Sequence, residues 1–190
     1  GHDLTLQDTA AHDAQNGVLG ASMNFNGGFA TSTTFGMTPG PGVTFAAWMR
    51  PRAFHGSHLW QISPSGSNYF ILAQFTEGLC GLAARVNVYG DYIGSNFTLC
   101  SASQLPANKW THVVVIYDDV MKSQLVYLNG VLDSRGGGNL AFPTTTINYM
   151  RLGGRFGGHG SDYWGHMDEA VVFNQALAPH EVDELFRYGV

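Results

Sequence analysis

The sequence predicts an all-β protein, a jelly-roll β-sandwich of two antiparallel sheets with one short C-terminal helix. Short apolar or alternating runs recur along the chain, and clusters of Gly, Pro, Asn and Ser separate them. Only the C-terminal segment has a convincing helical pattern. With 190 residues, 44% of them apolar, the chain can bury one well-formed core. We therefore expect a single domain spanning residues 1–190, of the sandwich or jelly-roll type.

Eleven segments carry the strand patterns. They are residues 21–25, 43–50, 58–63, 69–75, 79–89, 96–101, 110–117, 124–128, 131–134, 150–153 and 165–173. Turn-forming residues fill the intervals at 39–42, 66–68, 136–139 and 157–158. The pair Asn129-Gly130 between two apolar runs predicts a tight two-residue hairpin.

The last strand leads directly into the predicted helix. Pro179 stands where a helix would begin, and Gly189 stands where it would end. One apolar stripe is formed by Val182, Leu185 and Phe186, which are three and four residues apart. We expect this stripe to be buried against the sandwich.

The composition points away from nucleic acids. Charged residues make up only 12% of the chain, and the formal net charge is −5. Nucleic-acid binding requires a basic surface. A surface of Ser, Thr, Asn, Gln, Gly and Tyr is typical of extracellular β-proteins and sugar binders, but a polar surface without any ligand has the same composition. No apolar run has the length needed to span a membrane.

Two cysteines and one glycosylation sequon favour a secreted or cell-surface location. Cys80 and Cys100 each fall in a predicted strand. If those strands are neighbours, a disulfide between them would contribute roughly 3 kcal/mol; otherwise the two residues are buried thiols. Asn96 begins an Asn-Phe-Thr sequon, so its side chain is a candidate glycosylation site.

Five motifs occur in the order found in a known family. They are Met-Asn-Phe-Asn-Gly-Gly at 23–28, Val-Thr-Phe-Ala-Ala-Trp-Met-Arg-Pro at 43–51, the hairpin from 110–115 to 127–130, Arg-Leu-Gly-Gly at 151–154 and Gly-His-Met-Asp-Glu at 165–169. The chain resembles the laminin-G-like, concanavalin A-like lectin/glucanase jelly rolls over nearly its whole length. The resemblance implies the fold. It specifies function weakly, because this fold hosts lectins, adhesion modules, toxin domains and glycosidases.

The arrangement of carboxylates argues against a glycosidase. Catalytic relatives carry Glu-x-Asp-x-x-Glu on one strand, which places alternate side chains on one face. The most similar string here, Glu181-Val182-Asp183-Glu184, falls on the predicted helix. Asp168 and Glu169 are adjacent, so on a regular strand they would point to opposite faces. We expect no enzymatic activity.

The resemblance also implies a calcium site. In calcium-binding relatives, the aspartate of the last strand joins backbone carbonyls of the opening strand. Here that aspartate is Asp168, Asn26 and Gly28 would offer carbonyls, and Asp13 would offer a second carboxylate. In the alternative interpretation, Asp168 accepts backbone N–H groups and fixes a turn.

A second candidate site lies in the glycine-rich loop at 155–164. Sugars present hydroxyls on their edges and C–H groups on their faces, so their sites combine planar polar groups with an aromatic side chain. The predicted ligand-binding residues are Arg155, Asp162, Tyr163 and Trp164, with a second wall from Tyr89, Asp91 and Tyr92. Alternatively, the loop aromatics only close the edge of the sandwich.

Together these observations predict a non-catalytic extracellular module that binds a carbohydrate or glycoprotein, with calcium as a candidate cofactor. It would be one module of a larger protein, without membrane insertion. A protein–protein adhesion module of the same fold is the first alternative, and a diverged glycosidase is the second.

Overall fold

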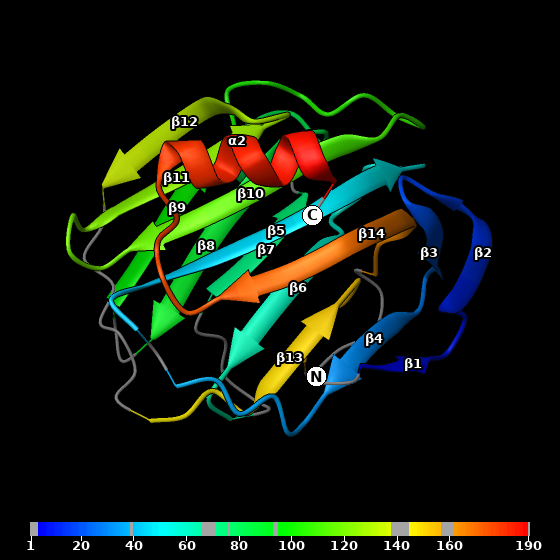
Figure 1. Cartoon of the computed structure of the whole chain (residues 1–190), viewed down its shortest axis with the longest axis horizontal. Helices are drawn as coiled ribbons and strands as arrows, with labels where there is room; N and C mark the ends of the chain where they lie inside the picture. The colour runs from blue at the N-terminus through cyan, green and yellow to red at the C-terminus, as the bar shows by residue number, and fades with distance from the viewer. Residues whose placement is uncertain are drawn as a thin grey trace.

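The computed structural model describes residues 4–38, 40–65, 71–75, 77–92, 95–137, 145–156 and 162–189. Within them, two sheets of seven antiparallel strands pack face to face (Figure 1). Sheet A has the order β1 (Thr5–Gln7), β4 (Phe29–Ser32), β13 (Tyr149–Leu152), β6 (His58–Ser63), β7 (Ile71–Phe75), β8 (Val86–Tyr92) and β9 (Ser95–Cys100). Sheet B has the order β12 (Val131–Gly137), β11 (Ser123–Leu128), β10 (Thr111–Asp118), β5 (Gly42–Pro51), β14 (Trp164–Phe173), β3 (Gly20–Asn26) and β2 (Ala11–Gly17). The predicted sandwich is confirmed.

The main core lies between the two sheets. At its centre, Phe45 of β5 stacks on Trp60 of β6, with ring centroids 4.5 Å apart and both side chains buried. Because β5 belongs to sheet B and β6 to sheet A, this aromatic pair joins the two layers. A second apolar cluster lies on the outer face of sheet B, under the C-terminal helix.

That helix, α2 (Pro179–Tyr188), covers only part of sheet B. Val182 is fully buried against β5, β10 and β11, and Leu185 packs beside it while partly exposed. Phe186 is also partly buried and lies 5.6 Å from the Trp48 ring. The predicted stripe therefore faces the sandwich. In Figure 1, α2 lies over β10 and β11, whereas β14, β3 and β2 have no helix in front of them.

The region around the cysteines differs from the prediction at one point. Cys80 lies in a one-turn helix, α1 (Glu77–Cys80), and β8 begins only at Val86, so the strand predicted at 79–89 starts too early. The disulfide with Cys100 of β9 is nevertheless confirmed, with Cα atoms 5.6 Å apart. The bridge ties α1 to an edge strand of sheet A. No helix in the described part of the chain is long and apolar enough to cross a membrane.

A β-bulge interrupts β14 between Asp168 and Val171. Glu169 at the bulge has a φ of +48°, so the strict alternation expected for Asp168 and Glu169 does not hold there. The extra residue changes which positions face the core. Beyond it, Val172 packs into the main core and Val171 faces the cluster under α2.

Candidate functional site

The residues of the predicted ligand loop lie in different parts of the sandwich. Trp164 begins β14 and has 39% of its surface exposed. Tyr163, the preceding residue, is fully buried beside Phe25, and its hydroxyl donates a hydrogen bond to the His166 carbonyl at 3.2 Å. Burial raises the pKa of Tyr163. Tyr163 therefore cannot offer a stacking face, and its prediction as a ligand-binding residue is wrong.

Two other predicted ligand-binding residues, Arg155 and Asp162, lie near strand β13 of sheet A. Arg155 is exposed, whereas Asp162 is nearly buried and acts electrostatically on Arg151 of β13. The pKa of Arg151 is lowered by burial, against the opposing effect of Asp162 and Asp8. Its guanidinium lies 3.7 Å from the Phe29 ring centroid. Asp162 is thus occupied in a structural cluster, and loop residues 157–161 lie outside the described residues.

Tyr89 lies on β8, three strands from β13 in sheet A. The register pairs Arg151 with Gln61, and the next strands pair Leu72 with Tyr89. Tyr89 therefore lies three strand spacings, or about 14 Å, from Arg151. Asp91 and Tyr92 follow in β8, and Asn96 lies in β9, but the side chains of these three residues lie outside the described part. Ligand contacts at 91 and 92 and glycosylation of Asn96 stay predictions.

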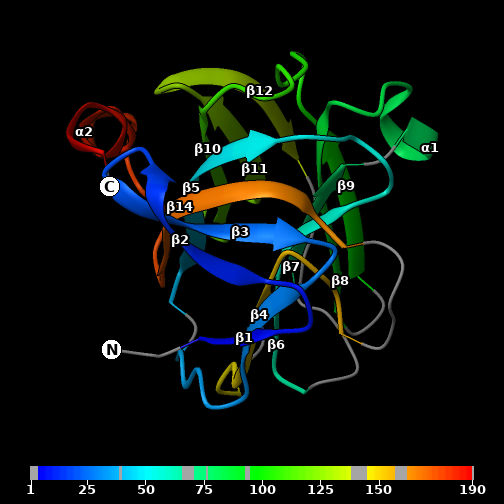
Figure 2. The same cartoon turned by 90° about the vertical axis from the view of Figure 1, so that its right-hand side faces the viewer.

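A group of aromatic, amide and guanidinium side chains surrounds Trp164 on the outer face of sheet B. We call it the Arg–Trp surface; its residues are Asn24, Asn26, Arg50, Arg52, Trp110, Trp164 and His166. They come from β3, the end of β5, the start of β10 and the start of β14. This is the part of sheet B that α2 leaves uncovered (Figure 1), and Figure 2 shows β2, β3, β14 and β5 side by side at this end.

Arg52 is held in place by neutral acceptors. Its Nη2 donates to the side-chain oxygens of Asn24 and Asn26 at 3.1 and 3.3 Å. The same nitrogen donates to the Phe25 carbonyl at 3.0 Å. The Thr9 hydroxyl donates a hydrogen bond to the Asn26 carbonyl at 2.7 Å. The guanidinium and the two carboxamides therefore form an ordered, exposed group of planar hydrogen-bonding side chains.

Arg50 lies next to this group. Its guanidinium carbon is 5.2 Å from the Trp110 ring centroid, a cation–π distance. Trp110 in turn meets the His166 ring edge-on at 6.3 Å. His166 Nδ1 is 3.1 Å from the Ser22 hydroxyl and 3.9 Å from Asp13 Oδ2. These contacts connect β2, β3, β5, β10 and β14 across one face.

Trp164 provides an exposed aromatic ring beside these polar side chains. It stands opposite Asn26 in the β14–β3 register, so the indole and the carboxamide are neighbours. A Cβ atom at Gly27 would lie 3.4 Å from the indole, and the His55 ring is 6.2 Å away. The glycine, whose φ is +85°, lets the indole pack closely over the β3–β4 turn. An exposed indole beside amides and a guanidinium can stack on a sugar ring while the polar groups bind its hydroxyls.

His166 makes stability depend on pH. Burial lowers its pKa from 6.5, the charges of Arg50 and Arg52 lower it further, and Asp13 partly opposes them. The folded protein thus favours neutral imidazole, so this contribution is complete above pH 6.5 and is lost as pH falls through the folded-state pKa. We expect the melting temperature to fall between about pH 7.5 and about pH 5, and to fall less in His166→Gln. Equal falls in both proteins would contradict this prediction.

The predicted calcium ligands are not brought to one point. Asp168 Oδ2 accepts the backbone N–H groups of Val18 and Leu19 at 2.7 and 3.2 Å. Asn26 pairs with Trp164 in the β14–β3 register. Trp164 lies four residues, or about 13 Å, from Asp168 along β14. In the described part of the chain, no three His, Cys, Asp or Glu side chains are grouped as for a metal. These four residues do not fit one calcium site, and calcium binding by the protein stays a prediction.

The other two predicted calcium ligands have local roles. Asp13 accepts hydrogen bonds from the Asn16 amide at 2.9 and 3.0 Å and from the Gln15 N–H at 3.2 Å. A Cβ atom at Gly28 would lie 2.3 Å from the Ala10 backbone nitrogen. The close packing of Gly28 explains the glycine there without a metal.

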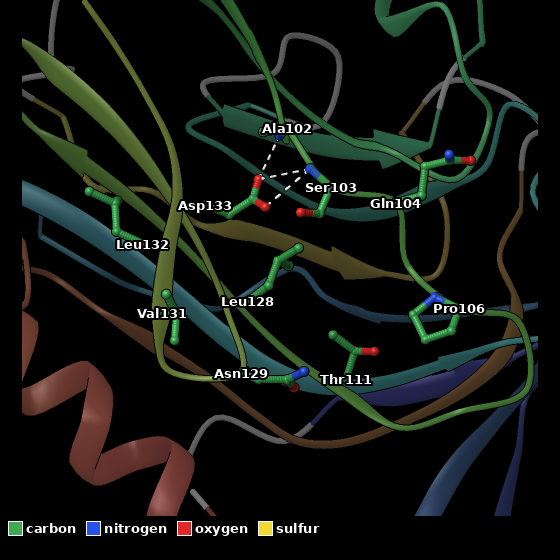
Figure 3. A pocket seen from close by; sticks show the side chains of 10 residues that line it. All are labelled: Ala102, Ser103, Gln104, Pro106, Thr111, Leu128, Asn129, Val131, Leu132 and Asp133. Atoms are coloured by element: carbon green, nitrogen blue, oxygen red, sulfur yellow. Dashed lines mark hydrogen bonds between the residues drawn. The ribbon is translucent and has the colours of Figure 1, made fainter.

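A pocket of about 430 Å³ opens at the same end of the sandwich, between the β9–β10 loop and the β11–β12 hairpin (Figure 3). Asp133 of β12 accepts the N–H groups of Ala102 and Ser103 at 2.6 and 3.1 Å, as the dashed lines in Figure 3 show. Its carboxylate therefore anchors the loop that leads to Trp110. The Thr111 hydroxyl is buried below the pocket without a partner among the described residues.

The carboxylates that most resemble catalytic acids are on α2, as predicted. Glu181 Oε2 accepts the Ala178 N–H at 2.6 Å and caps the helix. Asp183 forms an ion pair with Arg187 at 2.6 Å, one turn later. Both carboxylates stabilise the helix that they belong to.

Comparisons with solved structures agree with this architecture. A heptameric SAP-like pentraxin from Limulus polyphemus is 14% identical with a TM-score of 0.67, covering 83% of this chain and 75% of that one. Domain 4 of AbnA, an extracellular arabinanase from Geobacillus stearothermophilus solved in complex with arabinotriose, is 19% identical with a TM-score of 0.69, covering 94% of this chain and 82% of that one. The receptor-binding domain of botulinum neurotoxin type G is 11% identical with a TM-score of 0.68, covering 99% of this chain and 47% of that one. These likenesses concern the fold.

No curated protein has a sequence that matches this chain. The family comparison is more informative. It matches residues 23–183, from strand β3 of the sheet that carries the Arg–Trp surface to the closing helix. Since this range covers most of the 190 residues, the chain belongs to the concanavalin A-like lectin/glucanases superfamily.

Proposed function

We infer that this chain is a non-catalytic carbohydrate-binding module that acts outside the cell and recognises a glycan or glycoprotein through its Arg–Trp surface. One observation carries the proposal: the exposed Trp164 indole lies beside the carboxamide of Asn26, which the Arg52 guanidinium contacts at 3.3 Å. This combination suits the two sides of a sugar, its C–H face and its hydroxyl edge.

Three further observations support the proposal. Domain 4 of AbnA, which has the same fold, was solved with arabinotriose bound. The Cys80–Cys100 disulfide is typical of proteins from oxidising compartments, which favours an extracellular location. Glu181 and Asp183, the nearest match to a pair of glycosidase acids, are engaged within α2.

A glycan array, run with calcium and with a chelator, tests the proposal. We expect Trp164→Ala to weaken binding to any glycan on the array by about tenfold or more, because stacking on the sugar face is lost. Tyr188→Ala is the matched control, since Tyr188 is an aromatic residue on α2 with 74% of its surface exposed. The control should bind like the parent.

Each outcome is informative. Binding that Trp164→Ala leaves unchanged, in a variant that melts like the parent, would move the site elsewhere. Failure to bind any glycan would favour the alternative of a protein–protein adhesion module. Binding that disappears with chelator would establish the calcium dependence that the sequence predicts.

A further inference from the structure

We propose that the Arg–Trp surface selects acidic glycans, with a carboxylate or sulfate group of the sugar chain bound by Arg50 and Arg52. This inference rests on the proposed function and adds the chemical class of the ligand. Sugars of either kind present the same feature, an anionic oxygen cluster attached to a ring that Trp164 can stack on.

Among the described residues, neither the Arg50 nor the Arg52 guanidinium forms an ion pair with a carboxylate. The ion pairs in the described part of the chain are Lys122–Asp119, Arg187–Asp183 and the close approach of His166 to Asp13. Neither Arg50 nor Arg52 takes part in them. Arg52 is oriented by carboxamide and carbonyl oxygens, which are neutral, and Arg50 by the face of an indole. These contacts fix the positions of both guanidinium groups without cancelling their charge.

Arg50 and Arg52 are close enough in the chain to bind one anion together. Arg50 lies on β5, Arg52 follows directly after it, and both act on His166 from the same side of sheet B. Residues two apart on a strand are separated by about 7 Å, and two arginine side chains from such positions can reach one anionic group or two neighbouring ones. Guanidinium groups bind carboxylate and sulfate-like oxygens with paired, parallel hydrogen bonds.

The Arg–Trp surface differs in charge from the chain as a whole. The chain as a whole has a net charge of −5, which repels polyanions in general. On the Arg–Trp surface, Asp13 is the one carboxylate that acts on His166, and it already accepts hydrogen bonds from Asn16. A local positive surface on an acidic protein attracts an anion at this place. The overall charge argues against nucleic acid as the source of that anion.

The test compares three polysaccharides on the full chain by affinity electrophoresis or calorimetry. The probes are polygalacturonate for carboxylates, dextran sulfate for sulfates and unmodified dextran as the neutral polymer. We expect at least one acidic probe to bind about tenfold or more tightly than dextran, because charge-assisted hydrogen bonds are stronger than neutral ones. Binding should weaken between 0.1 M and 1 M salt, as the Debye length falls from about 10 Å to about 3 Å.

Variants assign the effect to the two arginines. Arg50→Gln combined with Arg52→Gln should remove the preference for the acidic probe, and the corresponding double lysine variant should retain part of it, since lysine keeps the charge but not the planar fork. Arg187→Gln is the control: it removes one guanidinium charge on α2, at an arginine paired with Asp183, and should bind like the parent. Melting curves check that each variant folds, and the lysine variant keeps the test valid if the glutamine variant does not.

The possible failures can be distinguished. If dextran binds as tightly as the acidic probes, or if the glutamine variant keeps the preference, the acidic class is wrong while the carbohydrate module stands. If Arg187→Gln weakens binding as much as the double variant, the effect is one of overall charge, and the assignment to this surface is wrong. If neither these probes nor any glycan on the array binds, both the inference and the proposed function fail. Tighter binding to DNA than to dextran sulfate would identify the anion as a phosphate and overturn the glycan assignment.

Discussion

Phe45→Ala is expected to lower the free energy of unfolding by about 4 kcal/mol, within the range measured for removal of a large buried aromatic side chain. Phe45 is 1% exposed and stacks on Trp60 from the opposite sheet at 4.5 Å. The substitution would leave a cavity between the two sheets. The rigid indole of Trp60 cannot fill it without losing its own packing. Urea denaturation followed by Trp fluorescence measures the change.

Val131→Ala provides the comparison, because Val131 is apolar, lies on sheet B and has 69% of its surface exposed. Its loss should stay within about 0.5 kcal/mol. If Phe45→Ala costs less than about 1 kcal/mol, the two sheets repack around the gap, and the aromatic pair does not determine how they are joined.

Asp168→Ala is expected to cost about 3 kcal/mol, since it removes a charged acceptor shared by several backbone donors and leaves those donors unsatisfied. Asp168 is 6% exposed and binds the N–H groups of Val18 and Leu19 in the β2–β3 turn, and that of Glu169. Gly17 fits beneath this carboxylate, where a Cβ atom would lie 2.6 Å from Oδ2. The loss should be the same with chelator as with added calcium. Thermal and urea unfolding in both solutions measure it.

Two variants complete this experiment. Asp168→Asn keeps an acceptor oxygen and should lose less than the alanine variant. Asp13→Ala should change stability little above pH 7, because the hydrogen bonds of Asp13 are to its near neighbours Gln15 and Asn16 and the His166 imidazole 3.9 Å away is then neutral. A loss at Asp168 that appears only when calcium is present would mean that the residue does ligate the ion, and that the turn contacts are secondary.

The strands that the sequence predicted well are those with one apolar face. The patterns of β5, β10 and β14 are apolar because these strands lie inside sheet B, with neighbours on both sides. Strand β2, Ala-His-Asp-Ala-Gln-Asn-Gly, is polar and mostly exposed, since it is the edge of sheet B. Strand β1 is an edge strand of three residues. Such strands are held by backbone pairing, so they were missed along with β4 and the single turn of α1.

The site was predicted only in part, for a related reason. Trp164 was identified because its loop is visibly rich in glycine and aromatics. Arg50 and Arg52 were not, although Arg50 lies near the end of β5 and Arg52 directly follows that strand. Their importance depends on β14 lying between β5 and β3, which brings together residues more than a hundred positions apart. The contact of Asp168 with the turn at Val18 was likewise not evident from the sequence, because the two residues are 150 positions apart.

The position of β14 in sheet B also has a consequence for biosynthesis. Among the described strands, β14 is the last in chain order, yet it lies between β5 and β3. Until it emerges, β3 and β5 have adjacent edges with unpaired backbone groups, and the nascent chain has no complete second layer on which the core can close. The sandwich is therefore expected to close only after β14 has left the ribosome. During that interval the open edges are the segments most exposed to aggregation, and a chaperone that binds extended strands would shield them.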